Sequence, residues 1–358
     1  MPETARQTAW LTKDNCTALR GLAILAIVLH NYCHWLGPAV KENEYTFTAA
    51  KAQAMWHALA CPDTWLPVNL VSFFGHYGVP VFLFLSGFGL VMKYERMDRL
   101  PVWRFIRYHY LKLFGMMVVG FAVFTAVDLI TPGSFHYHAA NVLAQLAMCI
   151  NLLPHPDRII WPGPYWFFGL MMQLYIVYRL LFFRRHWGFV AGAVALCWIV
   201  QAVQEPAGEA LNSLRYNCVG GMLPFGAGVL LGRMTRSGRL GTLAGMGRWA
   251  WLATAAAFSA LALLMSMRYQ LWLWTPLAVI VASVATVKAL PGGRAGWLVW
   301  VGRVSAAMFV LHPALRKVFI PLSRRGDVYD GLVLYIVGTL CLSWVLKMVL
   351  DNVQKPKL

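Results

Sequence analysis

Long apolar runs alternate with short polar segments along the 358 residues of this chain. A helix that crosses a membrane needs about 20 mostly apolar residues. Ten runs fit such helices: residues 18–37, 69–92, 110–131, 164–183, 187–204, 216–232, 249–267, 270–289, 297–320 and 329–350. The pattern predicts an all-α, polytopic membrane bundle of about ten transmembrane helices. We expect it to form a single membrane domain over residues 1–358, with no appended soluble domain.

A shorter apolar stretch, residues 139–153, is followed by Pro154 and Pro156. We expect a re-entrant or interfacial helix there, because a full span would move every later loop to the other side of the membrane. With ten spans, the basic segments Lys93–Arg107 and Arg233–Arg248 fall on the cytoplasmic side, as the positive-inside rule requires. The charge pattern therefore predicts that both termini are cytoplasmic.

The composition supports a membrane protein and excludes several other classes. The chain is 59% hydrophobic and 13% charged, whereas soluble domains are about 45–50% apolar and about 25% charged. The net charge of +17 lies mainly in loops between spans, so nucleic acid is not an expected partner. Seven scattered cysteines without metal-ligand spacing predict neither a disulfide framework nor a metal site. We expect no cleaved secretory signal, because a polar stretch precedes the first apolar run.

The first predicted span contains ionisable side chains, which are costly in hydrocarbon and usually mark function. Arg20 opens the span, and His30 and His34 lie further along it. On an ideal helix His30 lies about 80° round from Arg20, whereas Asn31 is about 20° and His34 about 40° away. Arg20 and His30 are about 15 Å apart along the axis, so we expect them to contact different parts of one elongated ligand. The structural alternative is that Arg20 snorkels to the interface and His30 makes an interhelical hydrogen bond.

The second predicted span contains Ser86 and Gly87 in the run Gly78–Gly89. Small residues at this spacing usually allow helices to pack closely. No general base stands at a spacing that would make Ser86 a convincing hydrolase nucleophile. The helix-packing interpretation is therefore favoured, and Ser86 stays as a secondary candidate.

A basic cluster, defined here as Arg104, Arg107 and Lys112, follows the second span. Arginine matches phosphate oxygens bidentately, so the cluster can bind the phosphates of a nucleotide-like cofactor. Membrane topology alone also places basic residues in cytoplasmic loops. The sequence leaves both interpretations open.

Later spans contain isolated polar groups. Gln173 lies in an apolar helix and needs a hydrogen-bond partner, and His312 precedes Pro313, where a kink can direct it inward. A lone histidine in a span is more often structural than catalytic. The other candidate site residues in these segments are Trp166, Tyr175 and Arg215.

Together, these segments resemble the acyltransferase-3 family of integral membrane O-acyltransferases, over nearly the whole chain. Family members carry an Arg and a His in the first span, a Phe-rich run ending in Ser-Gly-Phe, a basic cluster, a Trp-rich helix start and a terminal Ser…His pattern. The order of five weak motifs is fairly specific. The matching positions are Arg20 and His30, Phe82 to Phe88, Arg104 to Lys112, Trp166 with Gln173 and Tyr175, and Ser305 with Phe309 and His312.

Two positions depart from the family pattern. The family has ten residues between the Arg and the His, but nine separate Arg20 from His30, and Asn31 occupies the expected position. Either a local bulge turns His30 inward, or His34 replaces it, or the pair works in another geometry. The proline that usually follows the basic cluster, near Gly115, is also absent.

The resemblance implies transfer of an acyl group, most often acetyl, from cytoplasmic acyl-coenzyme A to a hydroxyl group of a cell-surface glycan or related acceptor. It implies a multi-pass protein of the inner (plasma) membrane, surrounded by lipid bilayer. Arg20 and the basic cluster would hold the phosphates of the coenzyme, and His30 or His34 would act as general base or carry the acyl group. The acyl chain, the acceptor and the oligomeric state stay open.

Two other functions remain as alternatives. A transporter or flippase of a small or lipid-linked substrate would also have polar residues and prolines inside its spans, although no inverted repeat stands out in the sequence. A family member that has lost catalysis could instead serve as a scaffold for glycan assembly, since the Arg–His spacing is altered. Both alternatives are distinguished from the enzyme by testing acyl transfer.

Overall fold

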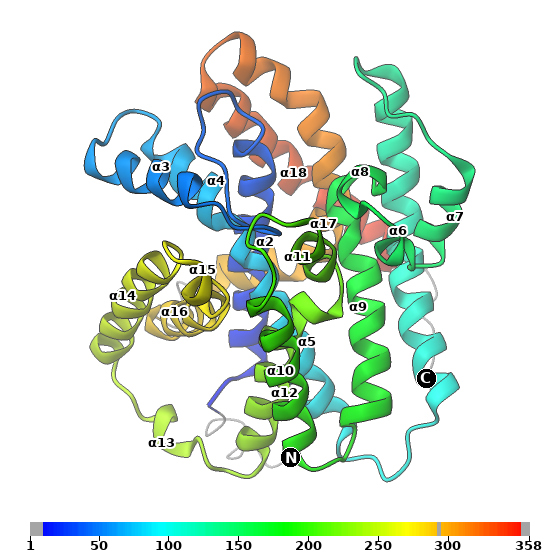
Figure 1. Ribbon diagram of the computed structural model, residues 1–358, viewed down its shortest axis with the longest axis vertical. Coiled ribbons are helices and arrows are strands. Elements are labelled where there is room, and N and C mark those ends of the chain that lie inside the picture. The colour runs from blue at the N-terminus through cyan, green and yellow to red at the C-terminus, as the bar shows by residue number, and fades with distance from the viewer. Residues whose placement is uncertain (1–9, 292–294, 352–358) are drawn as a thin grey trace.

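The computed structural model describes residues 10–291 and 295–351, and every regular element in these ranges is helical (Figure 1). The all-α prediction is confirmed. The terminal residues 1–9 and 352–358 lie outside the described ranges, so the predicted cytoplasmic location of the termini stays a prediction. In chain order the elements are α2 (Lys13–Cys33), α3 (Ala49–Ala60), α4 (Leu66–Phe74), η1 (Gly75–Tyr77), α5 (Gly78–Tyr94), α6 (Val102–Ile130), α7 (Ala139–Leu146), η2 (Ile150–Leu152), α8 (Pro156–Ile159), η3 (Gly163–Tyr165), α9 (Trp166–Val177), η4 (Tyr178–Phe182), α10 (Trp187–Ala202), α11 (Glu209–Arg215), α12 (Cys218–Arg236), α13 (Gly241–Ala244), α14 (Arg248–Met265), α15 (Tyr269–Trp272), α16 (Thr275–Ala289), α17 (Gly296–Arg325) and α18 (Val328–Asp351).

Eight helical segments in the described ranges are long and apolar enough to cross a membrane. Two shorter apolar helices, α10 and α16, coincide with the two remaining predicted spans. The multi-pass helical bundle is therefore confirmed. Residues 139–153 form only the short helices α7 and η2, as expected for a segment that does not cross the membrane.

Helix α2 lies inside the bundle, where it packs closely against α17 and also contacts α4, α5 and η1. The crossing of α2 and α17 depends on two glycines. A Cβ atom on Gly21 would lie 2.1 Å from the Leu298 carbonyl oxygen, and one on Gly302 would lie 1.9 Å from the Thr17 carbonyl oxygen. Only glycine permits this backbone approach, which holds α2 in a fixed position relative to α17.

The peripheral helices have a different character. Helix α14 pairs with α16 on one side of the molecule, and α18 packs on α17 (Figure 1). Most side chains of α14 and α18 are exposed in the protein alone. Because these side chains are apolar, their surfaces suit lipid contact.

Connecting segments cover the end of the bundle where α2 ends. The carboxylate of Asp128, at the end of α6, is fully buried and pairs with Lys317 of α17. Asp128 also accepts hydrogen bonds from the Phe135 amide, at 2.9 Å, and from the Tyr137 hydroxyl, at 3.0 Å. These contacts fasten the start of the long 132–163 segment to two helices.

Candidate active site

A cavity of about 240 Å³ lies at the C-terminal end of α2. Its walls come from α2, α9 and α17, from the segment between α2 and α3, and from the 132–163 segment. Two long connecting segments, far apart in the sequence, therefore contribute to it. The residues that line the cavity include His30, Asn31, His34, Trp35, Glu42, Glu44, Tyr45, His76, Asp157, Trp161, Trp166, Tyr216 and Arg316.

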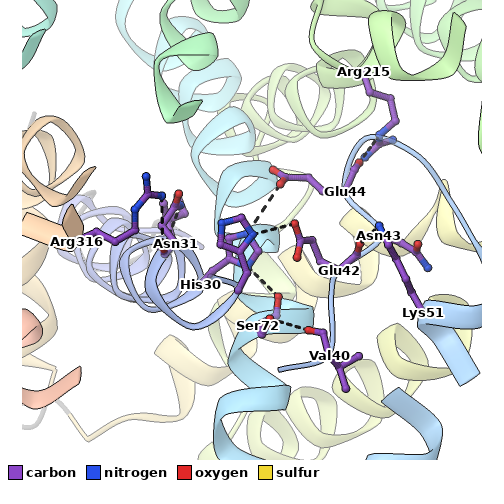
Figure 2. Close-up of polar contacts among 12 residues, drawn as sticks. His30, Asn31, Val40, Glu42, Asn43, Glu44, Lys51, Ser72, Arg215 and Arg316 are labelled. Carbon is purple, nitrogen blue, oxygen red and sulfur yellow. Dashed lines mark hydrogen bonds and ion pairs between the residues drawn. The ribbon is translucent and has the colours of Figure 1, made fainter. Parts of the chain in front are cut away.

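His30 is almost fully buried, and it faces this cavity from α2. Its Nδ1 atom lies 2.9 Å from the Ser72 carbonyl oxygen. A carbonyl only accepts, so Nδ1 carries the proton and Nε2 of the neutral ring carries a lone pair. The Ser72 hydroxyl in turn donates to the Val40 carbonyl at 2.7 Å. Nε2 points into the cavity, 3.9 Å from an oxygen of Glu44 (Figure 2).

Helix α2 is α-helical throughout residues 13–33. Of the three alternatives left by the sequence, the local bulge is therefore wrong, and His30 reaches the interior on a regular helix because η1 and the 34–48 segment pack beside it. Asn31 also lines the cavity, and its amide donates to the Ile27 carbonyl at 3.0 Å. His30 and Arg20 therefore do not share one face of α2, unlike the pair that the family spacing would give.

His34 and His76 surround His30. The ring centroids of His30 and His34 are 4.8 Å apart, and those of His30 and His76 are 5.6 Å apart. His34 Nδ1 lies 3.2 Å from a carboxylate oxygen of Glu42. Both candidate histidines, His30 in α2 and His34 at its C-cap, thus lie at one cavity, and they differ in their partners.

Two acidic residues enter the site from the segment that follows α2. Burial and the neighbouring Glu42 carboxylate raise the pKa of Glu44 to about 8. Burial alone would also raise the pKa of Glu42, but the hydrogen bond with His34 and the nearby His30 hold it below its ordinary value. The two carboxyls therefore differ in protonation near neutral pH: Glu44 keeps its proton and Glu42 is ionised.

The backbone around these carboxyls is held by distant side chains. Arg215 Nε donates to the Glu44 carbonyl at 2.7 Å, and the Trp272 indole donates to the Asn43 carbonyl at 2.8 Å. The Val40 amide donates to Asn69 at 3.0 Å. Arg215, a sequence candidate, therefore positions the acidic segment (Figure 2) and is not among the residues that line the cavity.

Aromatic rings form another wall of the cavity. The Tyr45 and Tyr216 rings stack with their centroids 4.0 Å apart, and Trp166 meets Tyr45 edge-on at 5.5 Å. Trp161 and Trp35 also line the space. Trp166, predicted from its place at a Trp-rich helix start, is thus part of the site.

Residues 15–348 match the model of the family described as an acyltransferase domain, Acyl_transf_3. The chain is a member of the acyltransferase-3 family. It is a membrane acyltransferase, as the resemblance of its motifs implies. The searches of curated proteins and of solved structures gave no match.

In this acyltransferase, Gln173 has the partners that its apolar helix requires. Its amide donates to Asn217 at 2.7 Å and accepts from the Cys218 amide at 2.8 Å. Asn217 also donates to the Asn151 carbonyl at 2.8 Å. Gln173 therefore joins α9 to the start of α12, a structural role next to the aromatic wall.

Arg20 and Lys112, two of the residues predicted to bind phosphates, have neighbouring aromatic partners in the acyltransferase. Arg20 is exposed and lies within electrostatic range of Tyr175, whose ring lies 4.1 Å from that of His109. The charge of Lys112 interacts electrostatically with the same His109 ring. The charges of Arg20 and Lys112 therefore each act on one ring of the adjacent Tyr175–His109 pair.

The other members of the basic cluster are placed differently. Arg104 and Arg107 are exposed on the first turns of α6. Arg107 lies about 140° round the helix from Lys112. The cluster therefore does not present one face, and Lys112 is the member whose charge reaches His109.

Two further sequence candidates are placed in helix packing. The Ser86 hydroxyl donates to the Phe82 carbonyl at 2.8 Å within its own helix, which supports the packing interpretation of its motif. His312 is fully buried, and its Nδ1 lies 3.1 Å from the Met308 carbonyl oxygen. Neither residue lines the cavity at the end of α2.

Several site residues of the acyltransferase were missed from the sequence. His76 and Arg316 lie inside predicted spans, where an ionisable residue is a signal of function, so both could have been found. Glu42 and Glu44 lie in a polar loop and give no such signal. His30, His34 and Glu42 also offer ligand atoms within 4.8 Å of one another, a grouping that the sequence, with its prediction of no metal, did not indicate.

Proposed function

We propose that this membrane acyltransferase moves an acyl group, most simply acetyl, from cytoplasmic acyl-coenzyme A to a hydroxyl group of a cell-surface glycan. The observation that supports this most directly is the His30 ring. It is held by the Ser72 carbonyl so that its basic Nε2 faces a cavity lined by aromatic rings and carboxyls. The proposed location is the inner membrane, with the acceptor entering from the outer side.

In the proposed reaction, the acceptor hydroxyl donates its hydrogen bond to His30 Nε2. The hydroxyl oxygen attacks the thioester carbonyl carbon while Nε2 takes the proton. The carbon–sulfur bond then breaks, the sulfur receives the proton from His30, and the products are an ester and free coenzyme A. Such general-base assistance contributes about 10²–10⁴-fold to the rate.

The surroundings of Nε2 suit a hydroxyl substrate. The gap of 3.9 Å between Nε2 and the Glu44 oxygen allows one hydroxyl oxygen to contact both groups, at ordinary hydrogen-bond distances. A protonated Glu44 would donate to that oxygen and His30 would accept from it. Ser72 and Glu44 would then orient the reacting groups from opposite sides of the ring.

The acyl-coenzyme A donor would enter from the cytoplasmic side of the membrane, opposite to the acceptor. Arg20 and Lys112 lie near Tyr175 and His109, and their cations suit the phosphates of coenzyme A. Arg20 precedes His30 by about 15 Å along α2. The coenzyme would therefore bind with its phosphates near Arg20 and its thioester directed toward His30.

The acceptor would occupy the cavity itself. Faces of Tyr45, Trp166 and Trp161 offer apolar surfaces for the C–H faces of a sugar ring, and Asp157 and Glu44 offer oxygens for its hydroxyls. An apolar wall with a few placed polar groups is typical of small-ligand sites. This combination supports a glycan acceptor over a purely apolar one.

The experiment uses purified protein, labelled acetyl-coenzyme A and a polysaccharide extract. We expect label in the glycan, a loss of about 10²–10⁴-fold in rate for His30→Ala, and normal membrane insertion of that variant. His34→Ala is the matched comparison on the same helix and should keep measurable activity, since its ring pairs with Glu42.

Other outcomes assign other functions. Full activity of His30→Ala with an inactive His34→Ala would move the base to His34. Coenzyme A binding without turnover would indicate the scaffold, and neither binding nor turnover would leave the transporter or flippase.

A further inference from the structure

Arg316 lines the same cavity as His30, but from α17. The side chain is buried, with 6% of its surface exposed. Its Nη1 atom donates to the Asn31 carbonyl over 3.4 Å, and its guanidinium lies 4.9 Å from the centre of the Trp35 ring. These two contacts fix the plane of the guanidinium at the cavity wall.

The charge of Arg316 has no carboxylate within ion-pair distance among the described residues. Its neighbour in sequence, Lys317, pairs with the buried Asp128. Another partly buried arginine, Arg233, pairs with Glu95. A buried cation without a counter-charge is costly, so an unpaired one in a cavity indicates that the counter-charge arrives with a ligand.

The carboxyls of the cavity have other partners. Glu42 pairs with His34, and Glu44 lies nearest to His30. Asp157 accepts from Asn212 at 3.2 Å. Figure 2 shows Arg316 on one side of His30 and both glutamates on the other. The cavity therefore has a cationic end at Arg316 and an acidic end at Glu42 and Glu44, with the His30 ring between them.

We propose that the acceptor carries an anionic group, a carboxylate or a phosphate, which Arg316 binds while a hydroxyl of the same molecule meets His30 Nε2. This rests on the proposed acyl transfer. The planar guanidinium matches two oxygens of either group at once. The Trp35 ring lies against the guanidinium and the Asn31 carbonyl takes one donor, which leaves other donors for a ligand in the cavity. The acceptor class is thus an acidic sugar, either a uronic acid or a sugar phosphate.

A different role for Arg316 would be to stabilise the oxyanion that forms from the thioester carbonyl. That role would affect every acceptor alike, because the oxyanion comes from the donor. If Arg316 instead binds the anionic group of the acceptor, its loss weakens the reaction only with acceptors that carry a negative charge. The two roles are therefore separated by comparing matched charged and neutral sugars.

The experiment uses full-length protein in lipid nanodiscs with labelled acetyl-coenzyme A. The acceptors are a glucuronic-acid oligosaccharide, its neutral glucose counterpart and a glucose phosphate. We expect Arg316→Gln to raise KM for a charged acceptor by about 10–100-fold and to leave the neutral one within about twofold. Arg316→Lys keeps the positive charge but lacks the planar guanidinium, so its KM for the charged acceptor should lie between those of wild type and Arg316→Gln. Arg324→Gln is the control, since Arg324 is on the same helix, bonds the Trp35 carbonyl and does not line the cavity.

The three acceptors also identify the anion. A KM effect confined to the uronic acid assigns a carboxylate, and one confined to the glucose phosphate assigns a phosphate. If Arg316→Gln reduces acyl transfer to charged and to neutral sugars equally, the proposal is overturned in favour of an oxyanion or structural role. A wild-type protein that acylates the neutral sugar at least as well as both charged ones would overturn it too.

A binding measurement separates this proposal from the proposed function. Intrinsic tryptophan fluorescence and the melting temperature are followed as each charged or neutral sugar is added without acyl-coenzyme A. Saturable binding to wild type but not to Arg316→Gln supports the anion site even where no acyl transfer occurs. Acyl transfer with no preference in binding between charged and neutral sugars refutes the anion site and keeps the acyltransferase.

Discussion

At the scale of single residues, the groups around His30 hold one another in place. The Ser72 carbonyl fixes which ring nitrogen is basic, and Glu44 faces that nitrogen at 3.9 Å. His34 and Glu42 form a second pair beside them. One cavity therefore contains a neutral carboxyl and an ionised one, which is how sites separate proton donation from charge stabilisation.

The raised pKa of Glu44 gives a prediction about stability. Its pKa is about 8 in the folded protein, against an ordinary value of 4.5. Between these values the folded protein binds one more proton than the unfolded chain, so stability falls as pH rises toward 8. We expect the ionisation of Glu44 to lower the free energy of unfolding by about 2 kcal/mol between pH 6 and pH 8. The check is the melting temperature in detergent as a function of pH.

Glu44→Gln cannot ionise and should melt with a shallower dependence on pH over that range. Glu205→Gln, which changes an exposed carboxylate, is the matched control and should follow wild type. Parallel curves for wild type and Glu44→Gln would show that Glu44 does not bind the extra proton.

Individual site residues differed in how far the sequence could predict them. His30 and His34 stood out as polar groups in an apolar run, and Arg316 carried the same signal without being recognised. Glu42 and Glu44 could not be found, because the return of their loop depends on capture by Arg215 and other groups far along the chain. A hydropathy pattern indicates which segments are apolar, but it does not predict hydrogen bonds between residues that lie far apart in the sequence.

At the scale of elements, the site depends on how closely α2 approaches its neighbours. The predicted spans corresponded to helices because their apolar runs are long. The crossing of α2 with α17 was not predictable, since a glycine that allows close packing reads in sequence like any other glycine. The same holds for Gly75, where a Cβ atom would lie 2.7 Å from the Cβ of His30.

The glycine at the α2–α17 crossing gives a second prediction. Gly302→Ala would place a Cβ atom 1.9 Å from the Thr17 carbonyl oxygen, so the helices must move apart. Overpacking of this kind costs about 1–3 kcal/mol, and both the melting temperature and acyl transfer should fall. Gly296→Ala is the control on the same helix, since nothing lies within 4 Å of a Cβ atom there. Equal effects of the two changes would contradict the tight crossing.

At the scale of the whole molecule, charge and hydropathy orient the bundle. The proposed mechanism needs the end of α2 with His30 on the outer side and the basic segments on the cytoplasmic side. The exposed Cys61, just after α3, should then lie outside, and the segment after α12 should lie inside.

This orientation can be measured by cysteine labelling in right-side-out vesicles. With the other cysteines replaced, an impermeant maleimide should label Cys61 at once. A Ser237→Cys variant, which uses an exposed position after α12, should react only after the membrane is permeabilised. The opposite pattern would invert the bundle, and labelling of both from outside would require a different number of spans between them.

The cavity joins residues from Ile27 to Arg316, and this spread has a consequence for biosynthesis. His30 is among the first residues of the bundle to leave the ribosome, yet the walls around it come from helices made much later. Because chains are synthesised from the N-terminus at about 5–20 residues per second, the early helices must wait in the membrane for α17. A nascent chain therefore carries His30 without the cavity around it, and the acyl transfer proposed above can begin only when nearly all of the protein has been translated.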